Sequence, residues 1–264
     1  MCRLLAYLGD PIALEDLIFK PEHSLVAQSY QPKELQIALL NADGFGLGWH
    51  HAEDPTAEPF IYRNVLPIWN DANLPHLCRY VRSRSFVANI RSATPGLPLD
   101  FSNCQPFSHG QLLFVHNGWI EQFRQTLYRP MRELIGDVAY QNIYGLTDSE
   151  HIFALIIHLL ELEPQMGLQN ALEQALEIVQ SLASKHSVRV SGTIILNDGK
   201  SLVATRFDNQ ETAPSFYYLR QDTGIILASE PLMEGDWQPL APDHSLTVAA
   251  ADLQPHIHGF SHAS

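Results

Sequence analysis

The middle of the chain limits the fold most, because two helical segments there separate two regions of strand-like sequence. Apolar residues recur every three to four positions over residues 149–163 and 168–186, which is the stripe of a helix that packs on a sheet. Pro164 and Gly167 separate the two helices. In the flanking regions, strands meet at hairpin signals such as Asp198-Gly199 instead of alternating with helices. This order predicts an α+β fold of antiparallel sheets with helices packed outside them, and argues against a doubly wound parallel fold.

Alternating or continuous apolar runs predict the individual strands. They cover residues 2–8, 45–50, 60–65, 85–91, 111–116, 188–197, 202–207, 215–219, 224–228 and 245–250. Weaker helical patterns cover residues 11–19, 73–82 and 119–134. The sequence has neither an internal repeat nor a linker-like stretch, so residues 1–264 are interpreted as a single domain.

Charge and cysteine content argue against several classes of function. The formal net charge of −13 opposes binding to nucleic acid or to an anionic membrane, and favours a small-molecule or protein partner. The three cysteines form no CxxC pair, and the apolar start lacks a basic leader, so we expect a cytoplasmic protein. No zinc-ligand spacing is present, and we predict no metal and no cofactor. The histidine-rich stretch 256–262 is interpreted as a solvated tail.

Cys2 is the first candidate for chemistry. Removal of Met1 would leave Cys2 with a free α-amine, whose reference pKa of about 7.7–8.0 lies close to the thiol value of about 8.5. The amine could then take the thiol proton, so that one residue supplies both nucleophile and base. On its own, Met-Cys is better explained as a small apolar residue at the start of a strand, and the chemical interpretation depends on the other motifs.

The tripeptide His116-Asn117-Gly118 directly follows an apolar strand. Attack on an amide carbonyl creates an oxyanion, which fixed hydrogen-bond donors stabilise. Asn117 offers a side-chain amide and Gly118 an unhindered backbone N–H, with His116 expected beside the substrate. Asn-Gly is also a common turn, so this motif is weak in isolation.

Two further motifs suit the two charges of an amino-acid substrate. Arg91 could hold a carboxylate bidentately, with the Thr94 hydroxyl beside it, although a surface salt bridge is the better explanation of this motif when it is taken alone. Thr147 and Glu150 have capping-box spacing at the start of the helix that begins near residue 149. Asp148 then lies in the first helical turn, where it either complements the helix dipole or binds a substrate ammonium.

In order along the chain, these motifs resemble a class II glutamine amidotransferase domain of the N-terminal-nucleophile (Ntn) hydrolase superfamily. The resemblance covers nearly the whole chain, and the joint order of the motifs makes it specific. The motifs lie at residues 1–4, 43–49, 91–94, 103–107, 116–118 and 147–150. The resemblance implies a four-layer αββα sandwich, formed by two antiparallel sheets flanked by helices.

The resemblance also implies a role for each candidate residue. Cys2 would be the nucleophile and its α-amine the base, while Asn117 and Gly118 would form the oxyanion hole. Arg91 would bind the α-carboxylate of the glutamyl group and Asp148 its α-ammonium. The roles implied by the family agree with those suggested by the residues themselves.

The start Met-Cys-Arg and the loop Asp-Gly-Phe-Gly-Leu-Gly-Trp look like the stand-alone branch of the family. That branch contains the ergothioneine-pathway γ-glutamyl hydrolase, which implies hydrolysis of γ-glutamyl-hercynylcysteine sulfoxide through a thioester. Two positions depart from the pattern expected there: Asn89 and Gln105 stand where histidine is expected. Both departures bear on the choice of leaving group.

Three other functions are open to the same sequence, and in each the chain could also assemble as a homo-oligomer. The first is a glutaminase subunit that delivers ammonia to a separate partner enzyme. An Ntn amidase acting on an acyl amide also begins Met-Cys, but His116 and Asp148 suit an amino-acid head better. A non-enzymatic scaffold is disfavoured by the intact nucleophile and oxyanion candidates, and an unprocessed Met1 would favour it.

Overall fold

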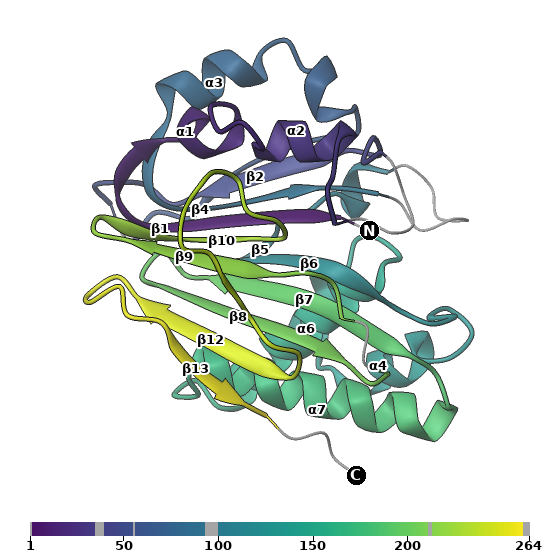
Figure 1. Cartoon of the computed structure of the whole chain (residues 1–264). Helices are drawn as coiled ribbons and strands as arrows, with labels where there is room; N and C mark the ends of the chain where they lie inside the picture. Colours follow the sequence, from purple (N-terminus) through teal and green to yellow (C-terminus); the bar gives the residue numbers. More distant parts are fainter. Residues whose placement is uncertain (1, 35–39, 55, 93–99, 211–212, 261–264) are drawn as a thin grey trace.

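The protein is described by a computed structural model, in which residues 2–34, 40–54, 56–92, 100–210 and 213–260 are placed well enough to describe (Figure 1). The described strands form two antiparallel sheets that lie face to face. The strand order is β11-β9-β10-β1-β4-β2-β3 in the first sheet and β13-β12-β8-β7-β6-β5 in the second.

The elements have the following bounds. The first sheet contains β1 (Arg3–Ala13), β2 (Phe45–Trp49), β3 (Phe60–Asn64), β4 (Arg82–Ile90), β9 (Tyr217–Gln221), β10 (Gly224–Ala228) and β11 (Gln238–Pro239). The second contains β5 (Phe107–His109), β6 (Leu112–Ile120), β7 (Val190–Asn197), β8 (Ser201–Asp208), β12 (His244–Ala249) and β13 (His256–Gly259). The helices are α1 (Glu15–Ile18), α2 (Leu25–Tyr30), η1 (Ile68–Asn70), α3 (Leu74–Tyr80), η2 (Phe101–Asn103), α4 (Tyr128–Leu134), α5 (Asp137–Gln141), α6 (Asp148–Leu162) and α7 (Leu168–His186).

The fold has four layers, helices–sheet–sheet–helices, and one apolar cluster lies between each pair of neighbouring layers. This confirms the predicted αββα sandwich. One cluster joins α1, α2 and α3 to the outer face of the first sheet. A second joins α4, α6 and α7 to the outer face of the second sheet. The third lies between the sheets and contains side chains from β1, β4, β6, β7 and β8. None of the helices in the described ranges is both long and apolar enough to cross a membrane.

Along these strands, the inner faces of the two sheets are polar at each end and apolar in between. A buried hydrogen bond from Ser85 Oγ in β4 to Asn197 Oδ1 in β7, 2.8 Å long, ties the sheets together. Two residues further along the same faces stand three members of the inner cluster, Val87, Val115 and Ile195. Two residues further still stand Asn89, Asn117 and Thr193. Side chains alternate between the faces of a strand, so these three polar side chains also point between the sheets.

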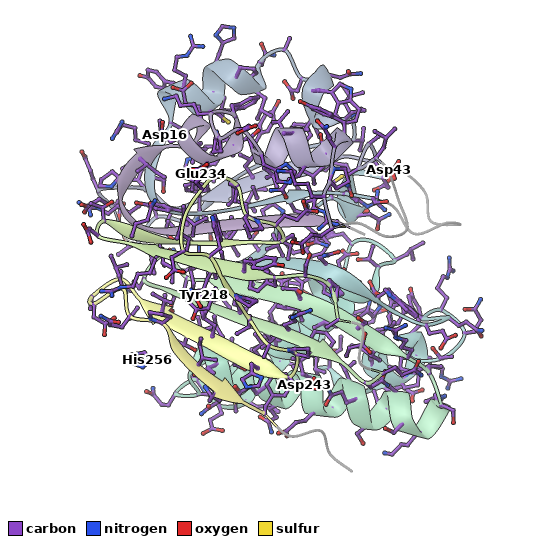
Figure 2. All side chains as sticks on the ribbon, in the orientation of Figure 1. Asp16, Asp43, Tyr218, Glu234, Asp243 and His256 are labelled. Atoms are coloured by element: carbon purple, nitrogen blue, oxygen red, sulfur yellow. The ribbon has the colours of Figure 1, made fainter. Side chains whose placement is uncertain are left out.

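Of the three weaker helical predictions, the one over residues 73–82 is confirmed by α3, and the other two needed correction. In place of a helix over residues 11–19, β1 continues past a bulge and pairs Ala13 with Arg82, so that α1 is short. In place of a helix over residues 119–134, β6 continues to Ile120 because its ladder with β7 does, and α4 begins at Tyr128. The start of the predicted solvated tail is strand β13, which pairs with β12 at the edge of the second sheet, where Figure 2 labels His256.

Candidate active site

Cys2 lies immediately before β1, at the end of the sandwich where the polar inner-face residues gather. Its Sγ is 3.9 Å from the carbonyl oxygen of Ser92, just beyond β4, and the side chain is partly exposed. Leu4 and Ala6 point into the cluster between the sheets, so alternation along β1 directs Cys2 to the same inner face. Met1 lies outside the described residues. The thiol therefore stands at the rim of the inter-sheet space.

Arg3 fixes the backbone next to Cys2 from the other face of the sheet. Its guanidinium lies 3.2 Å from Glu230, and both side chains are 1% exposed. The Glu230 carboxylate also lies 2.7 Å from His23 Nε2 and accepts the backbone N–H groups of Lys33 and Glu34. Burial alone would raise the pKa of Glu230, but these hydrogen bonds and the charge of Arg3 outweigh it and hold the pKa below its usual value. The start of β1 is consequently held by a buried ionic cluster.

Arg91 follows β4 directly and is 5% exposed. The register that pairs Arg3 with Ile90 puts Arg91 beside Cys2. Its backbone N–H donates to Gly44 O at 2.8 Å, and its Nη1 donates to Asp43 O at 3.3 Å. Asp43, labelled in Figure 2, lies at the end of the molecule where Figure 1 marks the N-terminus. A guanidinium and a thiol are thus brought together, whereas Thr94 lies outside the described residues.

Asn117 is fully buried on the inner face of β6. Neither its Nδ2 nor its Oδ1 has a hydrogen-bond partner among the described residues, and the same holds for both side-chain atoms of Asn89 and for Thr193 Oγ1. An unpaired buried polar atom costs about 1–3 kcal/mol, so proteins retain few of them. Asn117 faces Thr193 across the β6–β7 ladder, and Asn89 stands beside Leu4 across the β1–β4 ladder. A group of buried polar side chains with unused hydrogen-bonding capacity therefore lies on the inner faces at the same end of the sandwich as Cys2.

The backbone of β6 leaves the N–H of Gly118 free of the ladder with β7. In an antiparallel strand, the N–H and C=O of one residue point to the same side, and that side alternates along the chain. His116 is bonded through both groups by Gln105 on the β5 side, and Ile120 N donates to Asp148 Oδ2 at 2.8 Å on that side. Gly118 lies between them, so its N–H points to the same open edge. It is available as an oxyanion donor.

The predicted place of His116 beside the substrate needs correction. Its ring is 2% exposed and lies on the outer face of β6, opposite Asn117, with Nδ1 2.9 Å from Ser149 Oγ. A Cβ at Gly118 would be 2.4 Å from His116 Nε2, and one at Gly192 would be 2.6 Å from it. The ring therefore covers two glycines, whose lack of side chains makes room for it. Burial lowers the pKa of His116, so the imidazole is neutral.

Asp148 is the first residue of α6 and lies beside the open edge of β6. Its Oδ1 accepts Ser149 N at 2.8 Å, while Oδ2 accepts Ile120 N. Thr147 Oγ1 accepts Glu150 N at 3.3 Å, which confirms the predicted cap. The Glu150 carboxylate returns to Thr147, where it accepts the hydroxyl at 3.2 Å and the backbone N–H as in a capping box, and it also accepts the N–H groups of residues 144 and 145. A fixed carboxylate thus stands two residues from Gly118 along the strand edge.

His151, one turn further into α6, gives folding stability a pH dependence. It is fully buried; burial and the charge of Arg132 outweigh its hydrogen bond to Thr147 O and lower its pKa to about 4. Between pH 6.5 and 4 the unfolded chain protonates this imidazole but the folded protein does not. Unfolding free energy should therefore fall as pH drops through that window, by on the order of 3 kcal/mol from this residue. Urea titrations across that pH range measure the loss.

The matched variant for this prediction is His151→Gln. Glutamine can donate to Thr147 O and accept from Arg132, as the imidazole does, but it does not titrate. The variant should lose less stability between pH 6.5 and 4 than the wild type. Equal slopes for the two proteins would contradict the assignment of the effect to His151.

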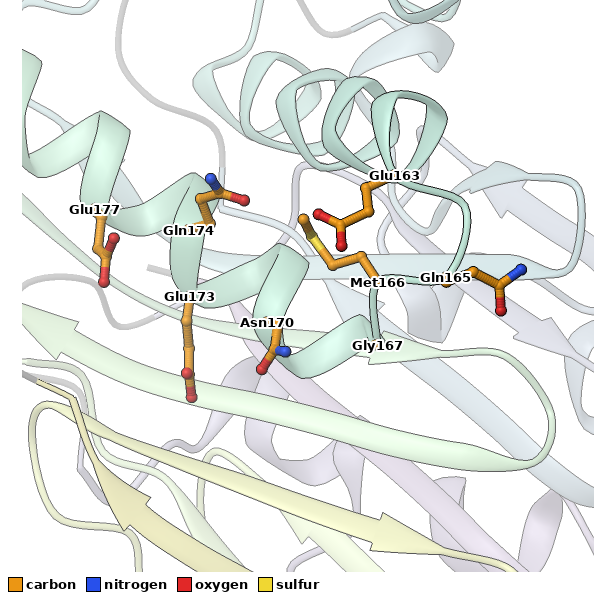
Figure 3. A pocket seen from close by; sticks show the side chains of 8 residues that line it. All are labelled: Glu163, Gln165, Met166, Gly167, Asn170, Glu173, Gln174 and Glu177. Atoms are coloured by element: carbon orange, nitrogen blue, oxygen red, sulfur yellow. The ribbon is translucent and has the colours of Figure 1, made fainter.

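A hollow of about 440 Å³ between the end of α6 and the start of α7 is unrelated to these residues (Figure 3). Its lining includes Glu163, Glu173 and Glu177, and contains none of the candidate residues. Within the described part of the chain, no group of His, Cys, Asp and Glu side chains is arranged to hold a metal ion.

Comparison with known proteins gives a consistent picture. The sequence pattern of class II glutamine amidotransferases matches residues 19–220. A γ-glutamyl-hercynylcysteine sulfoxide hydrolase of Mycolicibacterium smegmatis is 29% identical over 254 residues, which cover 96% of this chain and 98% of that protein. A probable glutamine amidotransferase of Saccharomyces cerevisiae is 28% identical over 302 residues, which cover 97% of this chain and 84% of that protein.

Solved structures show the same similarity in three dimensions. A glutamine aminotransferase class-II domain protein from Silicibacter pomeroyi superimposes with a TM-score of 0.72 at 30% sequence identity, over 98% of this chain and 100% of that one. At that coverage the match spans both sheets and the helices that cover them.

Proposed function

This chain belongs to the class II glutamine amidotransferase family, and we propose that it cleaves its substrate with Cys2 as an N-terminal nucleophile. Family membership gives it the Ntn hydrolase fold and makes it a hydrolase of γ-glutamyl amide bonds. We treat residues 1–264 as one such domain. The observation that carries the proposal is the meeting of Cys2, the unpaired Asn117 amide and the open Gly118 edge at one end of the inter-sheet space.

The proposed reaction begins when the α-amine of Cys2 takes the thiol proton. The thiolate attacks the γ-carbonyl carbon, and the carbonyl electron pair moves to the oxygen, where Asn117 and Gly118 donate hydrogen bonds. The carbonyl re-forms as the C–N bond breaks, and the amine leaves with a proton from the Cys2 ammonium. Water then attacks the thioester and releases glutamate and the free thiol.

The charges at the site suit the head of a γ-glutamyl substrate. Arg91 is proposed to bind the α-carboxylate, with Thr94 beside it, and Asp148 to bind the α-ammonium. Asp148 already accepts Ile120 N and Ser149 N, so its orientation is set before substrate arrives. His116 supports this site from the outer face of β6 without reaching the substrate.

The proposed substrate is γ-glutamyl-hercynylcysteine sulfoxide, in ergothioneine biosynthesis in the cytoplasm. Its support is the name of the Mycolicibacterium smegmatis relative, which covers nearly the full length of both chains. We expect glutamate release from this compound with a kcat/KM at least about tenfold higher than from glutamine, a difference of ~1.4 kcal/mol. Quantifying glutamate under single-substrate conditions measures both values. A preference for glutamine would contradict the assignment.

The alternative is a glutaminase subunit that delivers ammonia to a separate partner enzyme. The name of the Saccharomyces cerevisiae relative, a probable glutamine amidotransferase, favours it. Glutamine hydrolysis that is slow for the isolated chain, or for its homo-oligomer, and rises when a partner enzyme is added would support this alternative.

A further inference from the structure

We propose that Gln105 is a positioning residue for the oxyanion hole: its carboxamide replaces a neighbouring strand beside His116 and so fixes the backbone that presents Asn117 and Gly118. The inference rests on the proposed function, in which those two residues stabilise the oxyanion. Gln105 itself does not touch the reacting atoms.

The contacts of Gln105 are those of a rung in a β-ladder. Its Oε1 accepts the N–H of His116 at 2.6 Å, and its Nε2 donates to His116 O at 3.0 Å. The side chain is 6% exposed, so water does not compete freely for these groups. β5 pairs with β6 from His109 to Phe107, and in that register the next hydrogen-bonded rung lies opposite His116, at Gln105 itself. A carboxamide carries a donor and an acceptor side by side, as a strand backbone does, and it supplies the next rung.

Gly118 is consequently held from both directions along the edge of β6. Two residues before it, His116 is fixed by Gln105; two residues after it, Ile120 N is fixed by Asp148. The N–H of Gly118, between these two anchors, stays available to a substrate, although the strand on either side of it is held in place. An oxyanion donor is effective when it is already in place as charge develops, because no reorganisation is then needed.

Ser149 joins the two anchors into one network. Its hydroxyl lies 2.9 Å from His116 Nδ1, 3.4 Å from Gln105 Nε2 and 3.3 Å from Asp148 Oδ1. The hydrogen bonds therefore connect the oxyanion donors to the carboxylate proposed for the substrate ammonium. The spacing between those two sites is set by the protein, and the glutamyl chain must span it.

The first test is the Gln105→Met variant, which keeps the length of the side chain and removes both hydrogen bonds to His116. The oxyanion exists only near the transition state, so kcat for γ-glutamyl p-nitroanilide should fall by roughly 10–100-fold, while KM changes by less than about threefold. The inhibition constant of glutamate, which fills the same head-group site without forming an oxyanion, should also stay within about threefold.

The matched control is Gln180→Met. Gln180 is buried in α7, and neither atom of its carboxamide has a hydrogen-bond partner among the described residues, so the same change is made away from β6 and from the residues around Cys2. Gln180→Met should keep its kcat. If Gln105→Met weakens glutamate binding as much as it lowers kcat, or leaves kcat unchanged, the positioning role is overturned.

A second variant, Gln105→Glu, tests the donor separately. Its carboxylate still accepts from His116 N, but it places a second acceptor against His116 O until the introduced carboxyl is protonated and regains a donor. The ratio of variant to wild-type kcat should therefore rise as pH is lowered from about 8 to 5. A flat ratio contradicts the inference. Wild-type protein that hydrolyses no γ-glutamyl amide would instead overturn the proposed function itself.

Discussion

Cys2→Ala is expected to lower kcat/KM for γ-glutamyl amide hydrolysis by ~10⁴-fold or more, because it removes the atom that forms the thioester. The fold should survive the change. The Cys2 side chain is partly exposed, and its Sγ makes one long contact, 3.9 Å to Ser92 O, so little packing is lost. Thermal unfolding should show a midpoint close to that of the wild type, while glutamate release falls to background.

Chemical labelling tests the role of Cys2 independently of the kinetics. The glutamine-derived electrophile 6-diazo-5-oxonorleucine should add once to the wild type, at Cys2 of a chain that lacks Met1, and should not add to Cys2→Ala. Cys78→Ala is the control, because burial raises the pKa of the Cys78 thiol to about 12 and keeps it protonated. Retained Met1 in an active protein, or activity in Cys2→Ala, would remove the basis for N-terminal nucleophilic catalysis.

Asn117→Leu is expected to separate activity from stability. Loss of one oxyanion donor lowers kcat by about 10²–10³-fold in comparable hydrolases. Asn117 is fully buried and has no hydrogen-bond partner among the described residues, so leucine, of similar size, gives up no protein hydrogen bond. Unfolding free energy should stay the same or rise, by up to about 1–3 kcal/mol.

The comparison for this variant is Asn197→Leu. Asn197 is also fully buried, but it accepts Ser85 Oγ at 2.8 Å and Gly199 N at 2.7 Å, so its replacement should destabilise the protein and leave the oxyanion donors intact. Guanidinium denaturation and steady-state kinetics measure both effects. An Asn117→Leu protein that is less stable and fully active would show that Asn117 is a structural residue.

The residue pattern was enough to predict antiparallel sheets with helices outside them, and the resemblance to a known family supplied the four layers and the roles of the candidate residues. The helix pair was clear because α7 carries its buried apolar residues on one face over several turns, and α6 is a long, mostly apolar segment that is buried on nearly all sides. The ends of β1 and β6 were not predictable, because neighbouring strands extend them through residues that carry no strong local preference. The local sequence pattern therefore located the long helices and strands, but not those strand ends that are determined by pairing with a neighbouring strand.

The candidate site, like the fold, was predictable from the sequence only in part. Alternation along β6 would have placed His116 with Phe114, on the face opposite Asn117, and this signal was available in the sequence. The pairing of Arg3 with Glu230 was not available, because the two residues lie near opposite ends of the sequence. Gln105 was noticed only as a departure from an expected histidine, and its two bonds to His116 required the structure.

The central place of β1 has a consequence for how the protein is made. β1 lies between β4 and β10, and β10 is among the last strands to leave the ribosome. The start of β1 therefore lacks one neighbouring strand until β10 has been made, and the removal of Met1 that the proposed function needs can take place during that time. We expect a recombinant protein carrying an N-terminal affinity tag to fold and remain inert, and one tagged at the other terminus to mature normally.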